Sequence, residues 1–117
     1  MSATPDLAER TKEYSLRIIR LHAALPRSRV AQILGDQLLR SATSVGAQYR
    51  EARRAKSTAD YVSKVEGAQQ EAEESAYWLE LLAGSNLIPA QKLTGLLDET
   101  NQIQAILTTM ARKAKSR

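Results

Sequence analysis

A regular apolar stripe between Ser57 and Asn86 constrains the fold of this chain more than any other feature. Its members recur at alternating steps of four and three residues: Tyr61, Val65, Ala68, Ala72, Ser75, Leu79 and Leu82. This heptad rhythm is typical of a long helix that packs lengthwise against other helices. Because the middle of the stripe carries only Ala and Ser, two helix backbones can approach each other closely there. The pattern predicts a bundle of long helices.

Three further helices are predicted from similar stripes and from the residues that cap them. The four predicted helices span residues 6–25, 29–56, 58–84 and 89–111, and a basic tail follows at 112–117. Asp6, Ser28 and Ser57 each stand where an N-cap residue would begin a helix.

The predicted helices are separated by residues that stop or start a helix. Pro26 ends the first helix, Gly84 closes the third as a C-cap glycine, and Pro89 opens the fourth at its first position. The short connections predict an all-α, elongated, up-down-up-down antiparallel four-helix bundle.

Composition bounds the class of protein. A chain of 117 residues is expected to form one domain with a real core. It has no Cys, which excludes disulfides, thiolate metal sites and a Cys nucleophile. No apolar run approaches the roughly 18 residues of a membrane span, and residues 1–6 lack the features of a signal peptide. We expect a cytoplasmic protein that does not enter a membrane.

No residue set in the sequence indicates catalysis. His22 is the only histidine, and the di-iron bundle pattern requires Glu-x-x-His motifs from facing helices. Phosphate-cradling glycine loops and the common hydrolase motifs are missing from the sequence as well. The sequence therefore predicts no enzyme, no catalytic residues, no metal and no cofactor. An enzyme would require an unexpected metal or a pocket built across subunits.

Charge is distributed unevenly along the chain. Residues 1–56 carry 11 Lys/Arg and 5 Asp/Glu, a net of +6, whereas residues 57–111 carry 2 and 8, a net of −6. The last six residues add a further +4. Such asymmetry suggests interaction either with a polyanion or between the basic face of one subunit and the acidic face of another.

A basic cluster lies at the end of the second predicted helix. Its cations complement the negative end of the helix dipole, or they contact phosphates of a nucleic acid. Few aromatic residues are available, so any recognition should be led by phosphate contacts and sensitive to salt. The candidate nucleic-acid-binding residues are Arg40, Arg50, Arg53, Arg54, Lys56, Arg112 and Lys113.

A second apolar flank accompanies the main stripe of the third predicted helix. It includes Trp78 and Leu81, and it indicates either a wide core-facing stripe or a contact with another subunit. We favour a contact between subunits, because Leu16, Ile19 and Leu39 also lie off their helices' main stripes. The candidate interface residues are Glu71, Glu74, Trp78 and Leu81.

Two segments resemble a known family. Gln37 to Val45, followed by Glu51, is similar to the central motif of bacterial four-helix-bundle proteins encoded in intervening sequences of large-subunit ribosomal RNA genes. Tyr61 to Leu82 resembles the third helix of that family. The resemblance implies a homopentamer, a ring of bundles around a central channel. It extends to accessory variability determinants of diversity-generating retroelements, which bind a reverse transcriptase and nucleic acid through a basic surface.

Two functional interpretations follow. The first is a non-enzymatic homopentamer that binds RNA or DNA, in particular structured RNA or an RNA–protein complex, or that assists a reverse transcriptase. The alternative is an oligomeric protein-interaction scaffold whose basic cluster contacts Glu71, Glu73 and Glu74 of a neighbouring subunit. Arginines on an open face would favour the first interpretation, and arginines that line a subunit contact would favour the second.

Overall fold

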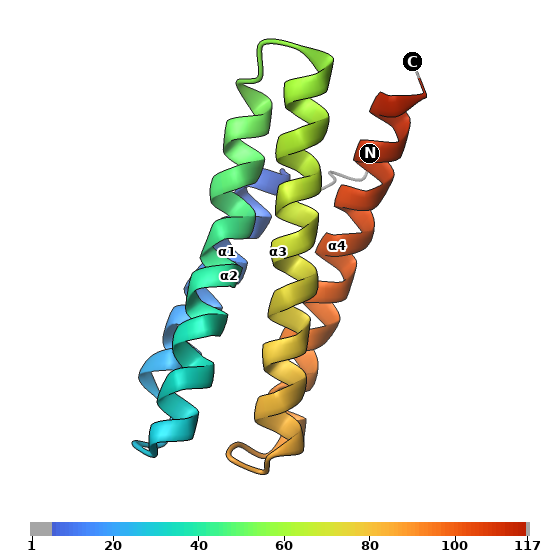
Figure 1. Ribbon diagram of the computed structural model, residues 1–117. Helices are drawn as coiled ribbons and strands as arrows, with labels where there is room; N and C mark the ends of the chain where they lie inside the picture. Colours follow the sequence, from blue (N-terminus) through green and yellow to red (C-terminus); the bar gives the residue numbers. More distant parts are fainter. Residues whose placement is uncertain (1–5, 117) are drawn as a thin grey trace.

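The computed structural model describes residues 6–116, which form four α-helices and no strand (Figure 1). This confirms the all-helical prediction. The helices lie roughly side by side along the longest of the three dimensions, which are 47, 32 and 19 Å. Their bounds are α1 Leu7–Ala23, α2 Arg29–Arg53, α3 Thr58–Gly84 and α4 Thr94–Lys115, with a short 3-10 helix, η1, at Ala90–Lys92.

The first three helices begin at the predicted capping residues. The side chain of Asp6 accepts a hydrogen bond from the backbone N–H of Ala8, and Ser57 accepts one from Asp60. Ser28 caps α2 in the same way. Each bond satisfies one of the backbone donors that a helix start leaves without an intrahelical partner.

Two predictions about the α3–α4 connection are wrong. Gly84 is the last residue of α3, but the left-handed backbone that turns the chain belongs to Asn86, with φ of 60°. Pro89 does not open α4. It precedes η1, and α4 begins only at Thr94. The offset places Ile88 and Leu93, 7 % and 2 % exposed, in the core.

The end of the fourth helix also differs from the prediction. α4 continues to Lys115 and therefore includes most of the predicted basic tail, of which Arg117 lies outside the described residues. Ala111 and Ala114 are buried and extend the apolar stripe of α4. Lys115 forms an ion pair with Glu66 of α3. These contacts hold the tail in helical form. At the other ends, α1 and α2 stop at Ala23 and Arg53, short of the predicted 25 and 56.

The most extensive contact between two helices joins α2 and α3, as the small residues of the predicted stripe favour. Ala68, Ala72 and Ser75 of α3 are each at most 1 % exposed. The Ser41 and Ser75 hydroxyl groups are 2.7 Å apart across this seam. At the flank of the seam, a Cβ atom on Gly67 would meet the end of the Gln48 side chain, which can move aside.

A buried layer of hydroxyl groups crosses the core, with one member from each helix. Ser41 and Ser75 form one pair, and the Tyr14 hydroxyl lies 2.6 Å from Oγ1 of Thr100 in the other. All four residues are at most 1 % exposed. Burial raises the pKa of Tyr14, and its side-chain interactions with Thr100 and Ser75 partly oppose that shift. The phenol therefore stays neutral and holds its hydrogen bond.

The backbones of α1 and α4 approach each other at few points, so side chains join these two helices. Arg10 donates from Nε and Nη2 to the two carboxylate oxygens of Glu99, each at 2.8 Å. The same Nη2 donates to Gln102 at 2.8 Å. Arg10 and Glu99 are about four-fifths shielded, with side-chain exposures of 20 % and 19 %. This two-bond geometry fixes orientation as well as distance.

A glycine allows α1 to lie directly on α2. A Cβ atom on Gly46 would lie 3.1 Å from Oγ1 and 3.2 Å from Cβ of the fully buried Thr11. A Cβ atom on Gly84, by contrast, would meet nothing within 4 Å. Substitutions at these two positions therefore distinguish the need for close packing at Gly46 from the general cost of a glycine in a helix.

Replacing Gly46 with Leu should destabilise the fold, whereas Gly84→Leu should not. We expect Gly46→Leu to lower the free energy of unfolding by about 1–3 kcal/mol, because the side chain forces α1 away from α2. Urea denaturation followed by circular dichroism measures both variants. Equal midpoints for the two variants would show that α1 does not need the close approach at Gly46.

The Arg10–Glu99 pair should give stability a specific pH dependence. The hydrogen bond from Arg10 lowers the pKa of Glu99 below its usual 4.5, against an opposing effect of burial. A carboxyl group with a lowered folded-state pKa stabilises the fold above its unfolded pKa, and this contribution is lost as the pH falls through the folded value.

We expect Arg10→Met to lower the free energy of unfolding by about 1 kcal/mol at neutral pH. This difference from the unsubstituted protein should shrink as the pH falls below 4.5. Urea denaturation across a pH series measures it, and Lys12→Met, which removes an exposed cation from the same helix, is the control. A pH-independent difference would contradict the assignment.

Candidate nucleic-acid interface

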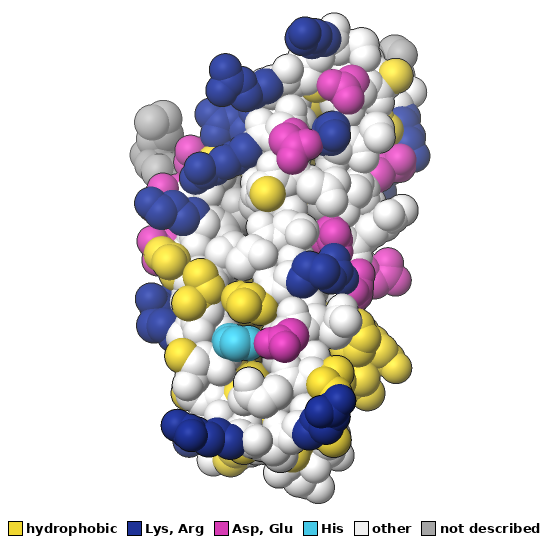
Figure 2. Space-filling view, turned by 60° about the vertical axis from the view of Figure 1, so that its left-hand side comes forward, with side chains coloured by type: hydrophobic (Ala, Val, Ile, Leu, Met, Phe, Trp, Pro, Cys, Tyr) yellow, Lys and Arg dark blue, Asp and Glu magenta, His cyan; other side chains and the backbone are white. Residues whose placement is uncertain are grey.

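Three arginines lie together at the C-terminal end of α2. Arg50, Arg53 and Arg54 are exposed and line one surface hollow with Asp6, Ala8 and Glu9 from the start of α1. The packing of Gly46 against Thr11 brings these two helix ends together. Figure 2 shows Lys and Arg side chains gathered over the upper part of this face, with some Asp and Glu side chains among them.

The guanidinium groups of these arginines are available to a ligand. Among residues 6–116, none of the three forms an ion pair within 4 Å, even though Asp6 and Glu9 line the same hollow. Tyr49 lies beneath them at 9 % exposure. Burial raises its pKa, and the charge of Arg53 opposes the shift. The end of α2 therefore presents planar, charged donors that suit phosphate oxygens.

Three more cations belong to the same end of the molecule. Lys56, in the α2–α3 connection, lines a small hollow with Tyr61 and with Ala114 of α4. Ala114 directly follows the exposed Arg112 and Lys113, which the last turns of α4 carry to this end. We define the basic end by six residues: Arg50, Arg53, Arg54, Lys56, Arg112 and Lys113.

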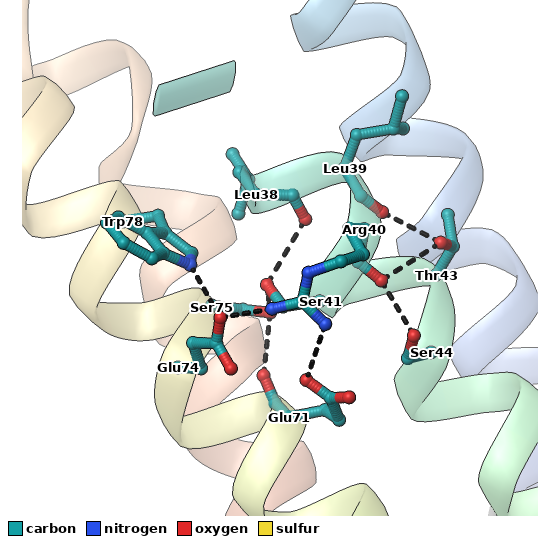
Figure 3. Close-up of polar contacts among 10 residues, drawn as sticks. All are labelled: Leu38, Leu39, Arg40, Ser41, Thr43, Ser44, Glu71, Glu74, Ser75 and Trp78. Atoms are coloured by element: carbon teal, nitrogen blue, oxygen red, sulfur yellow. Dashed lines mark hydrogen bonds and ion pairs between the residues drawn. The ribbon is translucent and has the colours of Figure 1, made fainter. Parts of the chain in front are cut away.

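Arg40 lies apart from the basic end, in the middle of α2 (Figure 3). Its Nη1 is 3.4 Å from Oε1 of Glu71, and its Nη2 pairs with Oε1 of Glu74. The hydrogen bond to Glu74 raises the pKa of Arg40. Glu74 also accepts a hydrogen bond of 3.2 Å from Nε1 of Trp78. The structure thus joins one predicted nucleic-acid contact to three predicted interface residues within a single chain.

The remaining hydroxyl groups of the Ser41–Ser44 segment bond to the backbone of their own helix. Thr43 Oγ1 donates to the Leu39 carbonyl at 2.7 Å, and Ser44 Oγ donates to the Arg40 carbonyl at 2.8 Å (Figure 3). Such bonds let hydroxyl residues lie inside a helix without an outside partner. This polar segment is therefore explained by local structure and by the Ser41–Ser75 pair.

An aromatic group marks the outer side of α3. Tyr77 is 54 % exposed and packs against the half-buried Trp78, with ring centroids 5.3 Å apart and planes tilted by 57°. Leu81 follows one turn later and is also half-buried. The interface candidates predicted from the sequence include Trp78 and Leu81 but leave out Tyr77. Its position four residues before Leu81, on the same helix face, is the signal that could have found it.

The fold does not gather other candidate metal-binding side chains into a site within residues 6–116. His22 bonds Oδ1 of Asp36 at 2.8 Å, and no group of three or more His or carboxylate side chains gathers as a metal site in this part of the chain. Over the same residues, no helix has both the length and the apolar character needed to cross a membrane.

Comparisons with known proteins found one matching family and a similar solved structure. The sequence profile of the 23S rRNA-intervening sequence proteins matches residues 5–109. Among solved structures, the chain is similar to a protein of unknown function from the S23 ribosomal protein family of Bacteroides thetaiotaomicron. The two are 32 % identical, the match covers 91 % of this chain and 98 % of that chain, and the TM-score is 0.85. No curated protein matches.

Proposed function

This chain belongs to the 23S rRNA-intervening sequence protein family, and we propose that it is a non-enzymatic homo-oligomer that binds nucleic acid through its basic end. The ligand is structured RNA or an RNA–protein complex. The observation that carries the proposal is the gathering of six exposed cations at one end of the bundle, none of them paired with a carboxylate among residues 6–116.

The chemistry of the basic end favours phosphate over bases. Arginine offers a planar fork of donors that matches phosphate oxygens, and the lysines add charge. The aromatic residues near this end, Tyr49 and Tyr61, are buried or half-buried and offer no open ring for base stacking. Binding of this kind depends on the shape and charge of the backbone more than on sequence.

The oligomer is proposed to form through the outer side of α3. Tyr77, Trp78 and Leu81 supply apolar area there, and Glu71 and Glu74 lie beside them. The subunit number of five, arranged as a ring, rests on the family resemblance alone. A reverse transcriptase is a further proposed partner on the same ground.

One observation weighs against the alternative scaffold interpretation. That interpretation needs Glu71, Glu73 and Glu74 to receive the basic cluster of a neighbouring subunit. Two of these carboxylates are already engaged by Arg40 of their own chain. The cations of the basic end therefore lack two of the three partners that the scaffold would give them.

Charge reversal at the basic end should weaken nucleic-acid binding without changing the fold. We expect Arg53→Glu with Arg54→Glu to lower affinity for a labelled hairpin RNA by about tenfold or more and to reduce the salt slope by about two. Fluorescence anisotropy across a salt series measures both quantities. The matched control is Arg27→Glu with Arg29→Glu at the other end of the bundle, and unchanged affinity in Arg53→Glu/Arg54→Glu would refute the proposal.

A second measurement addresses the assembly. Sedimentation equilibrium at micromolar concentration and physiological salt should give a pentamer, and Tyr77→Glu should shift it to smaller species, because the new charge would be buried. Gln70→Glu adds the same charge to an exposed position on α3 and should leave the assembly unchanged. A monomeric parent protein would contradict the ring.

A further inference from the structure

The end of the bundle opposite the basic end carries an apolar crevice. It lies between the α1–α2 and α3–α4 connections and has a volume of about 220 Å³. Lys92 lines it together with six apolar residues: Leu21, Ala24, Pro26, Leu87, Ile88 and Pro89. The crevice is therefore built from segments far apart in sequence that the fold brings together.

Hydrogen bonds hold both walls of this crevice in place. Gln32 Nε2 donates to the Pro26 carbonyl at 3.0 Å, which ties the α1–α2 connection to α2. On the other side, Ser85 Oγ donates to the Leu82 carbonyl at 3.1 Å, and Ile88 anchors the connection in the core. A ligand would meet a preformed site, which lowers the entropic cost of binding.

The two connections that form the crevice carry cations and no acidic residue. Residues 21–32 and 82–94 include Arg27, Arg29 and Lys92 and no Asp or Glu. Asp36 and Glu80 lie just beyond these ranges, and Asp36 is paired with His22. On the face shown in Figure 2, among the residues described, Lys and Arg side chains flank the lower end, and no Asp or Glu side chain lies below the level of the histidine drawn in cyan.

We propose that this end binds an acidic peptide segment of a partner protein. One apolar side chain of the peptide fills the crevice, and flanking Asp or Glu residues pair with Arg27, Arg29 and Lys92. This inference goes beyond the proposed nucleic-acid binding, because it concerns the other end of the molecule and a different class of ligand.

The size and lining of the crevice favour a peptide. A volume of about 220 Å³ lies below the roughly 300–1,000 Å³ of small-molecule sites. It suits one anchoring side chain of the kind that dominates protein interfaces. Phosphate groups gain nothing from an apolar lining, so a nucleic acid would leave the crevice unused. A surrounding field of one sign selects a partner of the opposite sign and speeds its association.

A peptide selection tests the proposal and does not require the partner protein to be identified first. A displayed library of random 12-residue peptides is selected on the purified full chain. The enriched peptides should combine several Asp or Glu residues with one Leu, Phe or Trp. We expect Ala24→Glu and Lys92→Glu, both at exposed positions, to weaken binding of an enriched peptide by about tenfold or more in fluorescence anisotropy. Replacing the apolar residue of the peptide with Ser should have a similar effect.

Matched variants separate this proposal from the proposed function. Arg53→Glu with Arg54→Glu should leave peptide binding unchanged, even where it abolishes RNA binding. The proposal is overturned if no acidic, apolar peptide is enriched relative to selection on Ala24→Glu, or if enriched peptides bind Ala24→Glu and Lys92→Glu normally.

Two other outcomes would assign this end to another ligand and equally overturn the proposal. In the first, the double variant Arg27→Glu/Arg29→Glu loses as much affinity for hairpin RNA as the double variant Arg53→Glu/Arg54→Glu does. The second is co-sedimentation with phosphatidylserine vesicles that depends on Arg27 and Arg29.

Discussion

The close approach of α2 and α3 is the contact on which the rest of the structure depends. Small side chains along the seam allow it, and the Ser41–Ser75 pair fixes how far one helix can slide along the other. The same register sets Glu51 beside Lys64 near one end of the seam. It also sets Arg40 beside Glu71 and Glu74 in the middle. α1 then packs on α2 and α4 on α3, so both ends of the molecule inherit their geometry from this one pair.

The hydroxyl layer adds specificity to a core that is largely apolar. Tyr14 and Thr100 form one pair of this layer, and Ser41 and Ser75 form the other. A slide of α1 against α4 by one turn would separate Tyr14 from Thr100 and leave the buried phenol without this partner, at a cost of about 1–3 kcal/mol. The other three hydroxyl groups also bond to backbone carbonyls of their own helices. In the native arrangement, the described residues contain no buried side-chain polar atom without a partner. The layer therefore penalises alternative registers that an apolar stripe alone would tolerate.

The sequence predicted the features that depend on neighbours along the chain and missed those that depend on pairing between helices. The stripe from Tyr61 to Leu82 and its cap at Ser57 predicted α3 with its observed bounds, because periodicity and capping are local. The partners of Arg40 lie more than thirty residues away, and only the α2–α3 register decides them. The buried hydroxyl layer could not be predicted for the same reason. The helical form of the tail could have been predicted, since Ala111 and Ala114 continue the stripe of Leu107.

The contact between α1 and α4 is sparse, so the bundle is less tightly closed on this side than between its other neighbouring helices. The first and last helices, α1 and α4, are joined mainly by the Arg10–Glu99 ion pair and the Tyr14–Thr100 hydrogen bond. Opening of this side would admit water to the Tyr14 hydroxyl while the α2–α3 seam stays intact. Regions with few contacts open locally at a lower free-energy cost than the rest of a fold. The amide groups of α1 should therefore exchange with solvent through partial opening, whereas those at the centre of α2 and α3 require the whole fold to come apart.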